Sequence, residues 1–274
     1  MRVFISADLE GITGVVHTDQ THNDGRGYPR AQELMTAEVN AAVAGAVEGG
    51  ATEVIVNDSH GSMRNILIER LDPRAHLISG TGKPLSMMQG IDASFAAALF
   101  VGYHARAGTP GVISHTYSGV VQRLVINGRE VGETGMNAGI AGYFGVPVTL
   151  VAGDSEVVRE ARELLGPYGE LQVVAVKEPQ GRYAALNLSL EEAHARIRAA
   201  ARQAVQRAGN MRPYRVPPPV TFEVTFTNAG MADLAGMIPG AQRPSPVTVS
   251  FTHDDYLVAF GAFRAMVTLA GQSG

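Results

Sequence analysis

Apolar runs alternate with helix-forming segments along the first 155 residues, and this alternation is the feature that most strongly constrains the fold. Residues 28–50 and 132–145 have helix-forming composition, and both segments end at glycine. Strands and helices that alternate in this way favour a parallel sheet covered by helices. We therefore predict an α/β fold that begins with a parallel-sheet α/β domain. The runs that predict its buried strands are residues 3–10, 52–58, 95–104 and 146–154.

The order of the predicted elements loosens after about residue 155. A charged helical segment at 155–166 precedes a short apolar run, a long Arg- and Ala-rich segment and a proline-rich connector. Apolar and polar residues then alternate at 220–228, which predicts a strand with one buried face. We expect a domain boundary between residues 165 and 166, with a smaller C-terminal α+β domain over 166–274. Its other expected elements are strands at 171–176 and 246–252, a helix at 190–208 and a final helix from about Asp254.

The composition excludes several classes of function. The chain of 274 residues has 22 Lys plus Arg against 26 Asp plus Glu, which argues against a nucleic-acid surface or a basic membrane-binding face. No apolar run approaches the ~20 residues of a membrane span, and the N-terminus does not resemble a signal peptide. We therefore expect a soluble cytoplasmic protein. Because there is no cysteine, any bound metal must be held by His, Asp, Glu or carbonyl oxygen.

Two carboxylates end the first predicted strand. Asp8 and Glu10 are two residues apart, so in an extended chain their side chains point to the same side. Neighbouring carboxylates repel and raise each other's pKa unless a proton or a cation joins them. The alternative is that one of them caps the turn marked by Gly11 and Gly14, while the other is solvated.

Two histidines follow other predicted strands. His60 comes after the strand at 52–58, and His104 ends the run at 95–104. The carboxyl ends of parallel strands meet at one edge of the sheet, where ligands bind, so we expect both imidazoles beside the two carboxylates. Either histidine alone would more often be an ordinary buried or surface residue. Asp58 lies in an Asn-Asp-Ser sequence, and we assign it to the turn or to supporting the site.

These residue types predict a metal centre. Oxygen and nitrogen ligands without sulfur suit zinc, manganese, cobalt or iron. The excess of carboxylates over the need of one ion suggests two ions that share a bridging acid, and Asp8 is the natural bridge because its side chain is short. Glu133, between glycines just before the helix at 132–145, is either a further ligand or an acid favoured by the helix dipole.

Four motifs follow one another in the first half of the chain: SADLEG, VNDSHG, GYHARAGTPGVISHT and VGETGMNAG. Together they resemble the successive motifs of the D-aminopeptidase family, the DppA-type binuclear zinc peptidases. The resemblance is dense over about the first 155 residues and weaker beyond them. The loop at 17–27 is less similar to the family, which bears on substrate preference and not on the reaction.

The resemblance implies two zinc ions per subunit, with Asp8 shared between them. Glu10 and His104 would complete the ligands of one ion, and His60 and Glu133 those of the other. The carboxylate of Glu133 is thereby assigned to the metal centre.

His115 lies in a short loop after His104, where by itself it would be read as a turn histidine. The resemblance implies that it is the catalytic side chain. It would act either as a nucleophile or as a proton donor that also stabilises the developing oxyanion. We favour the second role, because a hydroxide held by two metal ions already supplies the nucleophile.

We therefore expect a cytoplasmic zinc aminopeptidase that removes N-terminal residues from short peptides, including D-residue peptides such as D-Ala-D-Ala. The resemblance further implies a homo-decamer of two pentameric rings, and we expect the smaller domain to provide substrate access and oligomer contacts. Two alternatives use the same ligands: a binuclear metal-dependent phosphoesterase, and a peptide-binding protein with structural metals. Substrate chirality, peptide length and the physiological metal stay open.

Overall fold

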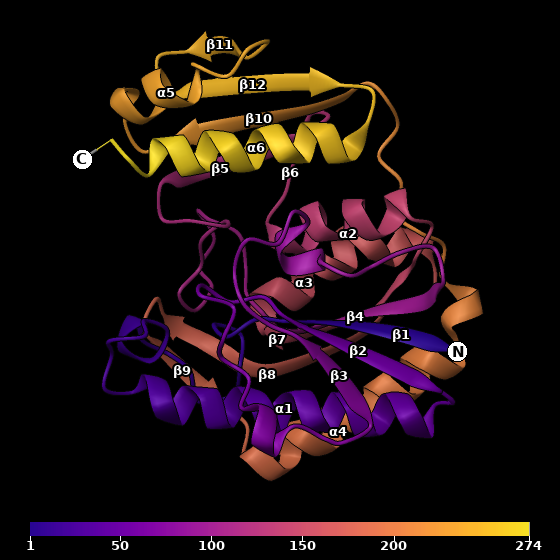
Figure 1. Cartoon of the computed structure of the whole chain (residues 1–274). Helices are drawn as coiled ribbons and strands as arrows, with labels where there is room; N and C mark the ends of the chain where they lie inside the picture. The colour runs from indigo at the N-terminus through magenta and orange to yellow at the C-terminus, as the bar shows by residue number, and fades with distance from the viewer. Residues whose placement is uncertain (274) are drawn as a thin grey trace.

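The computed structural model describes residues 1–273, which form two sheets with helices packed around and between them (Figure 1). The larger sheet has seven strands in the order β3-β2-β1-β4-β7-β8-β9. Its neighbouring strands are parallel except for β8 and β9, so the predicted parallel-sheet α/β fold is confirmed. These strands are β1 (Arg2–Ala7), β2 (Glu53–Asp58), β3 (Ala75–Ile78), β4 (Phe95–Tyr103), β7 (Val148–Asp154), β8 (Gln172–Gly181) and β9 (Ala184–Asn187).

Helices cover both faces of the larger sheet. Helices α1 (Tyr28–Glu48) and α4 (Leu190–Gln206) lie side by side on one face, the lower one in Figure 1. Helices α2 (Glu133–Tyr143) and α3 (Ser155–Leu165) lie on the other face. Both faces are therefore buried, which is why the central strands read as nearly continuous apolar runs.

The smaller sheet has five antiparallel strands in the order β11-β12-β10-β5-β6 and forms the upper part of Figure 1. Strand β10 alternates buried and partly buried residues, as predicted for a sheet with one buried face. Helix α6 covers that face and also contacts α2, which lies between the two sheets. The elements are β5 (Val121–Ile126), β6 (Arg129–Glu130), β10 (Val220–Phe226), β11 (Gln242–Ser245), β12 (Thr248–His253), α5 (Ala229–Ala235) and α6 (Tyr256–Ala270).

The division between the two sheets does not follow the expected boundary at residue 165. Strands β8 and β9 and helix α4 come after that residue but belong to the larger sheet, whereas β5 and β6 come before it but belong to the smaller one. Strand β5 pairs with β10, almost 100 residues further along the chain. Such a pairing leaves no trace in local composition, so a boundary drawn from composition cannot detect it.

Most of the long elements agree with the sequence patterns, but strand β5, helix α5 and the shortest strands were not predicted. The helices α1, α2, α3, α4 and α6 and the strands β1, β2, β4, β7, β8, β10 and β12 lie where they were predicted. Strands β3, β6, β9 and β11 have two to four residues each, too few for a recognisable period. Within residues 1–273, no helix combines the length and apolarity that crossing a membrane requires.

Candidate metal centre

Six side chains predicted from the sequence meet beyond the carboxyl ends of β1, β2 and β4. The turn after β1, the loop after β2 and the end of β4 deliver two carboxylates and two imidazoles to one edge of the sheet. The first residue of α2 and the long loop before β5 complete the group. The six residues are Asp8, Glu10, His60, His104, His115 and Glu133.

The two carboxylates that follow β1 converge on the ring of His60. The Nδ1 atom of His60 lies 3.3 Å from Asp8 Oδ1 and 2.8 Å from Glu10 Oε2. Asp8 and Glu10 are only 3% and 4% exposed. Strand β1 ends at Ala7, so both acids lie in the turn after it and not on the strand as expected. They still point to the same side, and the alternative that one of them is solvated is wrong.

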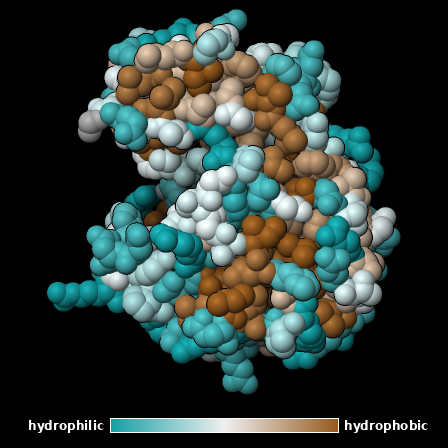
Figure 2. All heavy atoms as spheres, in the orientation of Figure 1, coloured by the Kyte–Doolittle hydropathy of each residue, from teal (hydrophilic) through white to brown (hydrophobic). Residues whose placement is uncertain are grey.

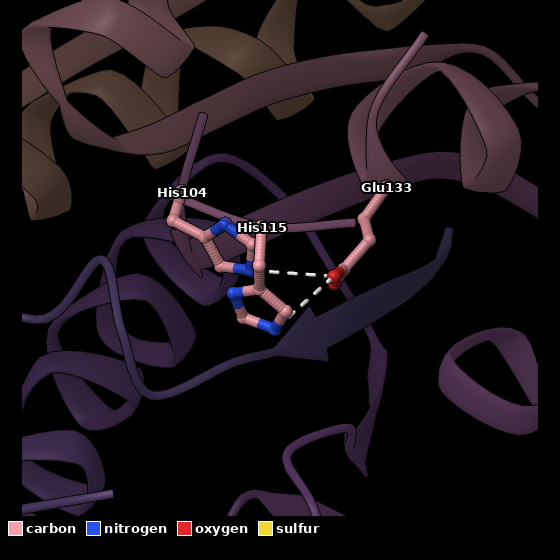
Figure 3. Close-up of side chains that lie close together, drawn as sticks. All are labelled: His104, His115 and Glu133. Atoms are coloured by element: carbon pink, nitrogen blue, oxygen red, sulfur yellow. Dashed lines mark ion pairs between the residues drawn. The ribbon is translucent and has the colours of Figure 1, made fainter. Parts of the chain in front are cut away.

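A second group forms on the other side of Asp8. The Nε2 atom of His104 lies 3.5 Å from Asp8 Oδ2 and 3.3 Å from Glu133 Oε1. Figure 3 shows the rings of His104 and His115 beside the carboxylate of Glu133. Asp8 thus presents one oxygen to His60 and the other to His104, which is the geometry expected of a bridging carboxylate.

Backbone hydrogen bonds select the tautomers of both imidazoles. His60 Nε2 lies 2.8 Å from the carbonyl of Thr21, and His104 Nδ1 lies 2.9 Å from the carbonyl of Ala105. Because a carbonyl can only accept, these nitrogens carry protons. The surrounding carboxylates outweigh burial and raise the pKa of His60 and of His104 well above the usual value, so without a metal the nitrogen that faces the carboxylates is protonated too, and a bound cation would take the place of that proton. This is the arrangement in which a histidine binds a metal while its other nitrogen donates to a backbone carbonyl.

Two buried polar atoms without hydrogen-bond partners lie at the centre of the site. Within residues 1–273, Glu10 Oε2 and His104 Nε2 are buried without a hydrogen-bond partner. Ligand atoms of Asp8, Glu10 and His104 all lie within 4.8 Å of one another. Buried lone pairs at such distances need a proton or a cation between them, and the oxygen and nitrogen donors suit zinc. The residues present thus fit the predicted metal.

The electrostatics of the site also favour positive charge. Burial and the neighbouring Glu10 raise the pKa of Asp8 to about 7. Burial acts in the same direction on Glu10, but the charge and hydrogen bond of His60 outweigh it and hold the pKa of Glu10 well below its usual value. Two adjacent carboxylates are therefore stable as anions only where a positive charge compensates them.

His115 differs from the other five residues in exposure. Its side chain is 24% exposed, its Nδ1 lies 3.0 Å from the carbonyl of Ile113, and its Nε2 lies 3.7 Å from Glu133 Oε1. The ring stacks on His104 with centroids 4.1 Å apart. Burial and the neighbouring His104 lower the pKa of His115. A nitrogen of His115 lies close enough to serve as a metal ligand, but its exposure and its longer contact favour action on a substrate.

The centre opens into a cavity of about 220 Å³. Sequence reasoning missed several of its lining residues, because they are isolated positions in irregular loops. The backbone N–H of Tyr117, one of these residues, donates to Glu133 Oε1 at 2.6 Å. Three of them have left-handed backbone conformations, which are uncommon outside glycine and concentrate at functional sites: Met63 (φ 54°), Ser86 (φ 49°) and Tyr117 (φ 66°).

A second cavity of about 230 Å³ adjoins the first and shares Glu10, His60 and Gly61 with it. Its opposite wall includes His22 and Asn23 from the loop at 17–27. Figure 2 shows the surface hollowed between the upper part of the molecule, with the smaller sheet, and the lower part. The loop that we expect to bear on substrate preference therefore reaches the centre.

Asp58 has the supporting role that was expected of it. Its carboxylate accepts hydrogen bonds from the backbone N–H groups of Asn65 and Ile66 and from the side chain of Asn65. Asn65 in turn donates to the carbonyl of His60. Asp58 thus fixes the loop that carries His60.

The chain is similar to known proteins over nearly its whole length. A family model described as D-aminopeptidase matches residues 1–265. A D-aminopeptidase of Bacillus subtilis (strain 168) is 41% identical over 271 residues, which cover 98% of both chains. The solved structure of the Zn-dependent D-aminopeptidase DppA from Bacillus subtilis, a self-compartmentalizing protease, superposes with a TM-score of 0.96 at 40% identity. That match covers 99% of this chain and 98% of the other.

Proposed function

This chain belongs to the D-aminopeptidase family, as its motifs indicated, and we propose that it is a zinc-dependent aminopeptidase acting on short peptides. One observation carries the proposal. Asp8 presents one oxygen to His60 and the other to His104, so that its carboxylate joins two buried groups of side chains able to bind metal, and the partly exposed His115 lies beside them on a cavity wall. The similar proteins are named as D-aminopeptidases, and one of them as Zn-dependent, which supports the same activity here.

We propose two zinc ions per subunit, with Asp8 as the ligand common to both. The shortest contacts favour Glu10 and His60 as the other ligands of one ion, and His104 and Glu133 as those of the second. The set that the family resemblance implies for one ion, Asp8, Glu10 and His104, also has its ligand atoms within 4.8 Å of one another. Ligands of one tetrahedral zinc lie roughly 3 to 3.5 Å apart, given metal–ligand bonds of about 2.0 to 2.1 Å. This grouping exchanges the two histidines between the sets that the family resemblance implies.

Bound zinc would supply Lewis-acid chemistry, polarising the scissile carbonyl and lowering the pKa of a water. His115 would move the proton. Its Nδ1 donates to the carbonyl of Ile113, so Nε2 faces Glu133 and the cavity with a free lone pair in the neutral ring. The lowered pKa of His115 favours this neutral form. Nε2 would take a proton during attack and return it to the leaving amine, so we propose proton transfer and not nucleophilic attack.

The size of the cavity supports short substrates. A cavity of about 220 Å³ suits a substrate as small as the dipeptide D-Ala-D-Ala. The second cavity, bounded by the loop at 17–27, would take the rest of the peptide. We propose a preference for D-residues from the names of the similar proteins.

We further propose a homo-decamer of two pentameric rings in the cytoplasm, with the smaller sheet and its helices contributing contacts and substrate access. The name self-compartmentalizing given to the similar protease supports an oligomer. Sedimentation velocity should give the mass of ten chains of 28.9 kDa. A monomer would contradict the assembly, and a secreted fraction would contradict the location.

The first experiment combines metal content with hydrolysis of D-Ala and L-Ala p-nitroanilides. We expect about two zinc ions per chain in the natural protein, with faster hydrolysis of the D-substrate. His60→Ala should lose one ion and activity, because a ligand is removed. His115→Ala should keep both ions but lose roughly 10²- to 10⁴-fold in kcat, the usual contribution of a general acid–base.

The alternatives predict different results from the same samples. A phosphoesterase would turn over p-nitrophenyl phosphate and leave the anilides intact. A peptide-binding protein with structural metals would hold zinc without turning over either substrate, because structural zinc sites leave no position for water. A metal-free chain, or full activity after chelation, would contradict the zinc mechanism.

A further inference from the structure

Lys177 is a buried lysine on β8 that neither the sequence motifs nor the proposed mechanism uses. Its side chain is 1% exposed. The ammonium donates to the carbonyl oxygens of Glu10 at 2.6 Å, Ile12 at 2.9 Å and Val15 at 2.5 Å. Three acceptors engage all three N–H donors of a charged lysine, so the hydrogen bonding of this buried ammonium is complete.

The three carbonyls belong to the turn that follows β1 and carries Glu10. Buried carbonyl groups are costly to leave without a donor, so this turn depends on Lys177 for its conformation. One of the acceptors is the carbonyl of Glu10 itself. A shift of the turn would therefore move the Glu10 carboxylate away from His60, 2.8 Å from it.

At the end of the neighbouring strand β7, a second buried charged residue holds another loop of the site by hydrogen bonds. Asp154, the last residue of β7, is the cross-strand partner of Lys177. Its carboxylate accepts from the backbone N–H of Val112 at 2.8 Å, in the loop that leads to His115, and from Val157 at 2.8 Å. Two strands that supply no predicted ligand thus fix the two loops that carry Glu10 and His115.

We propose that Lys177 is a positioning residue for the metal centre, holding the turn after β1 so that Glu10 binds its ion together with His60. The proposal rests on the zinc site put forward above. Supporting residues that orient metal ligands typically contribute a factor of 10 to 100 to metal affinity.

The test compares zinc affinity, measured by chelator competition, in the full-length protein and three variants. Lys177→Met keeps the length of the side chain but removes its donors. Lys177→Arg keeps the charge and the donors. Ile197→Ala, on the buried face of α4 within the same apolar core as β8, destabilises the fold without removing a hydrogen bond to the turn, and serves as the matched control.

We expect Lys177→Met to bind the more weakly held of two zinc ions about 10- to 100-fold less tightly, with Lys177→Arg recovering most of that loss. The kcat of Lys177→Met should lie closer to that of the natural protein at saturating zinc than at limiting zinc. Ile197→Ala should keep the natural zinc affinity despite its lower stability. Natural affinity in Lys177→Met, or an equal loss in Ile197→Ala, would overturn the proposal.

If Lys177→Met does not fold, Lys177→Gln replaces it, because an amide can still donate to two of the three carbonyls. An intermediate loss of zinc affinity would support the proposal, and natural affinity would overturn it. Failure of the proposed function looks different: the natural protein would bind zinc and hydrolyse no peptide. The zinc affinities of the variants would still decide the role of Lys177.

Discussion

At the scale of single residues, the metal centre depends on polar side chains held in a dry environment. Asp8, Glu10, His104 and Glu133 are all less than 5% exposed. Charges so placed are stable only when each is compensated, which is why the backbone donors and acceptors around them matter as much as the ligands. Glu38 and Lys177 extend this buried polar system behind the turn after β1.

Glu38 on α1 leads to a prediction about pH. Its Oε2 accepts from the backbone N–H of Thr13 at 3.0 Å, and burial raises its pKa to about 7 although Lys177 acts to lower it. The folded state therefore binds a proton that the unfolded state, with a Glu pKa near 4.5, releases between pH 4.5 and 7. The free energy of unfolding falls as the pH rises through this window.

Glu38→Gln keeps the acceptor but does not titrate, so it should lack this loss. We expect the stability of the natural protein relative to Glu38→Gln to fall by roughly 2 to 3 kcal/mol between pH 5 and pH 8. Denaturant unfolding at both pH values measures the difference, and the comparison cancels titrations common to both proteins. A difference that does not change with pH would contradict the pKa.

The sequence predicted the centre to the extent that strand ends determine it. Asp8, Glu10, His60 and His104 each follow a strand, so parallel-sheet geometry was enough to bring them together. His115 and Glu133 come from a loop and a helix start, and the family resemblance was needed to assign them. Lys177 could not be found this way, because a single lysine after an apolar run reads as solvated, and one of its acceptors, Val15, is 162 residues away.

At the scale of elements, the centre requires the turn after β1 to lie directly against the end of β4. The backbone N–H of Asp8 donates to the carbonyl of Val101, and that of Gly11 to the carbonyl of Gly102. Gly102 has φ 71°, and a Cβ atom there would overlap the carbonyl oxygen of Asp8. Only glycine combines this backbone conformation with so close an approach.

Gly102→Ala should therefore lower the free energy of unfolding by about 2 to 4 kcal/mol, from backbone strain and overlap together, and weaken zinc binding. Gly128→Ala is the matched control. Gly128 has φ 79° in the turn between β5 and β6, but an added Cβ would meet no described atom within 4 Å. Gly128→Ala should lower the free energy of unfolding by only about 1 kcal/mol and leave the zinc affinity unchanged. Equal effects of the two substitutions on zinc would contradict the packing argument.

At the scale of the whole molecule, the smaller sheet is tied to the wall of the cavity. Arg264 on α6 donates to the carbonyls of Lys83 at 2.7 Å and Pro84 at 2.8 Å, and to the hydroxyl of Tyr117 at 3.0 Å. Tyr117 in turn donates to Glu133 through its backbone. The chain passes repeatedly between the two sheets, and this explains why no single sequence boundary separates the site from the smaller sheet.

The central claim is that two zinc ions share Asp8, with His60 beside Glu10 and His104 beside Glu133. Crystals of the zinc-loaded protein, with diffraction measured on both sides of the zinc absorption edge, test it most directly. We predict two anomalous peaks on opposite sides of the Asp8 carboxylate, one bound by Glu10 and His60 and the other by His104 and Glu133. A single peak, or two peaks of which neither contacts Asp8, would contradict the claim, and peaks with the histidines exchanged would refute the ligand grouping.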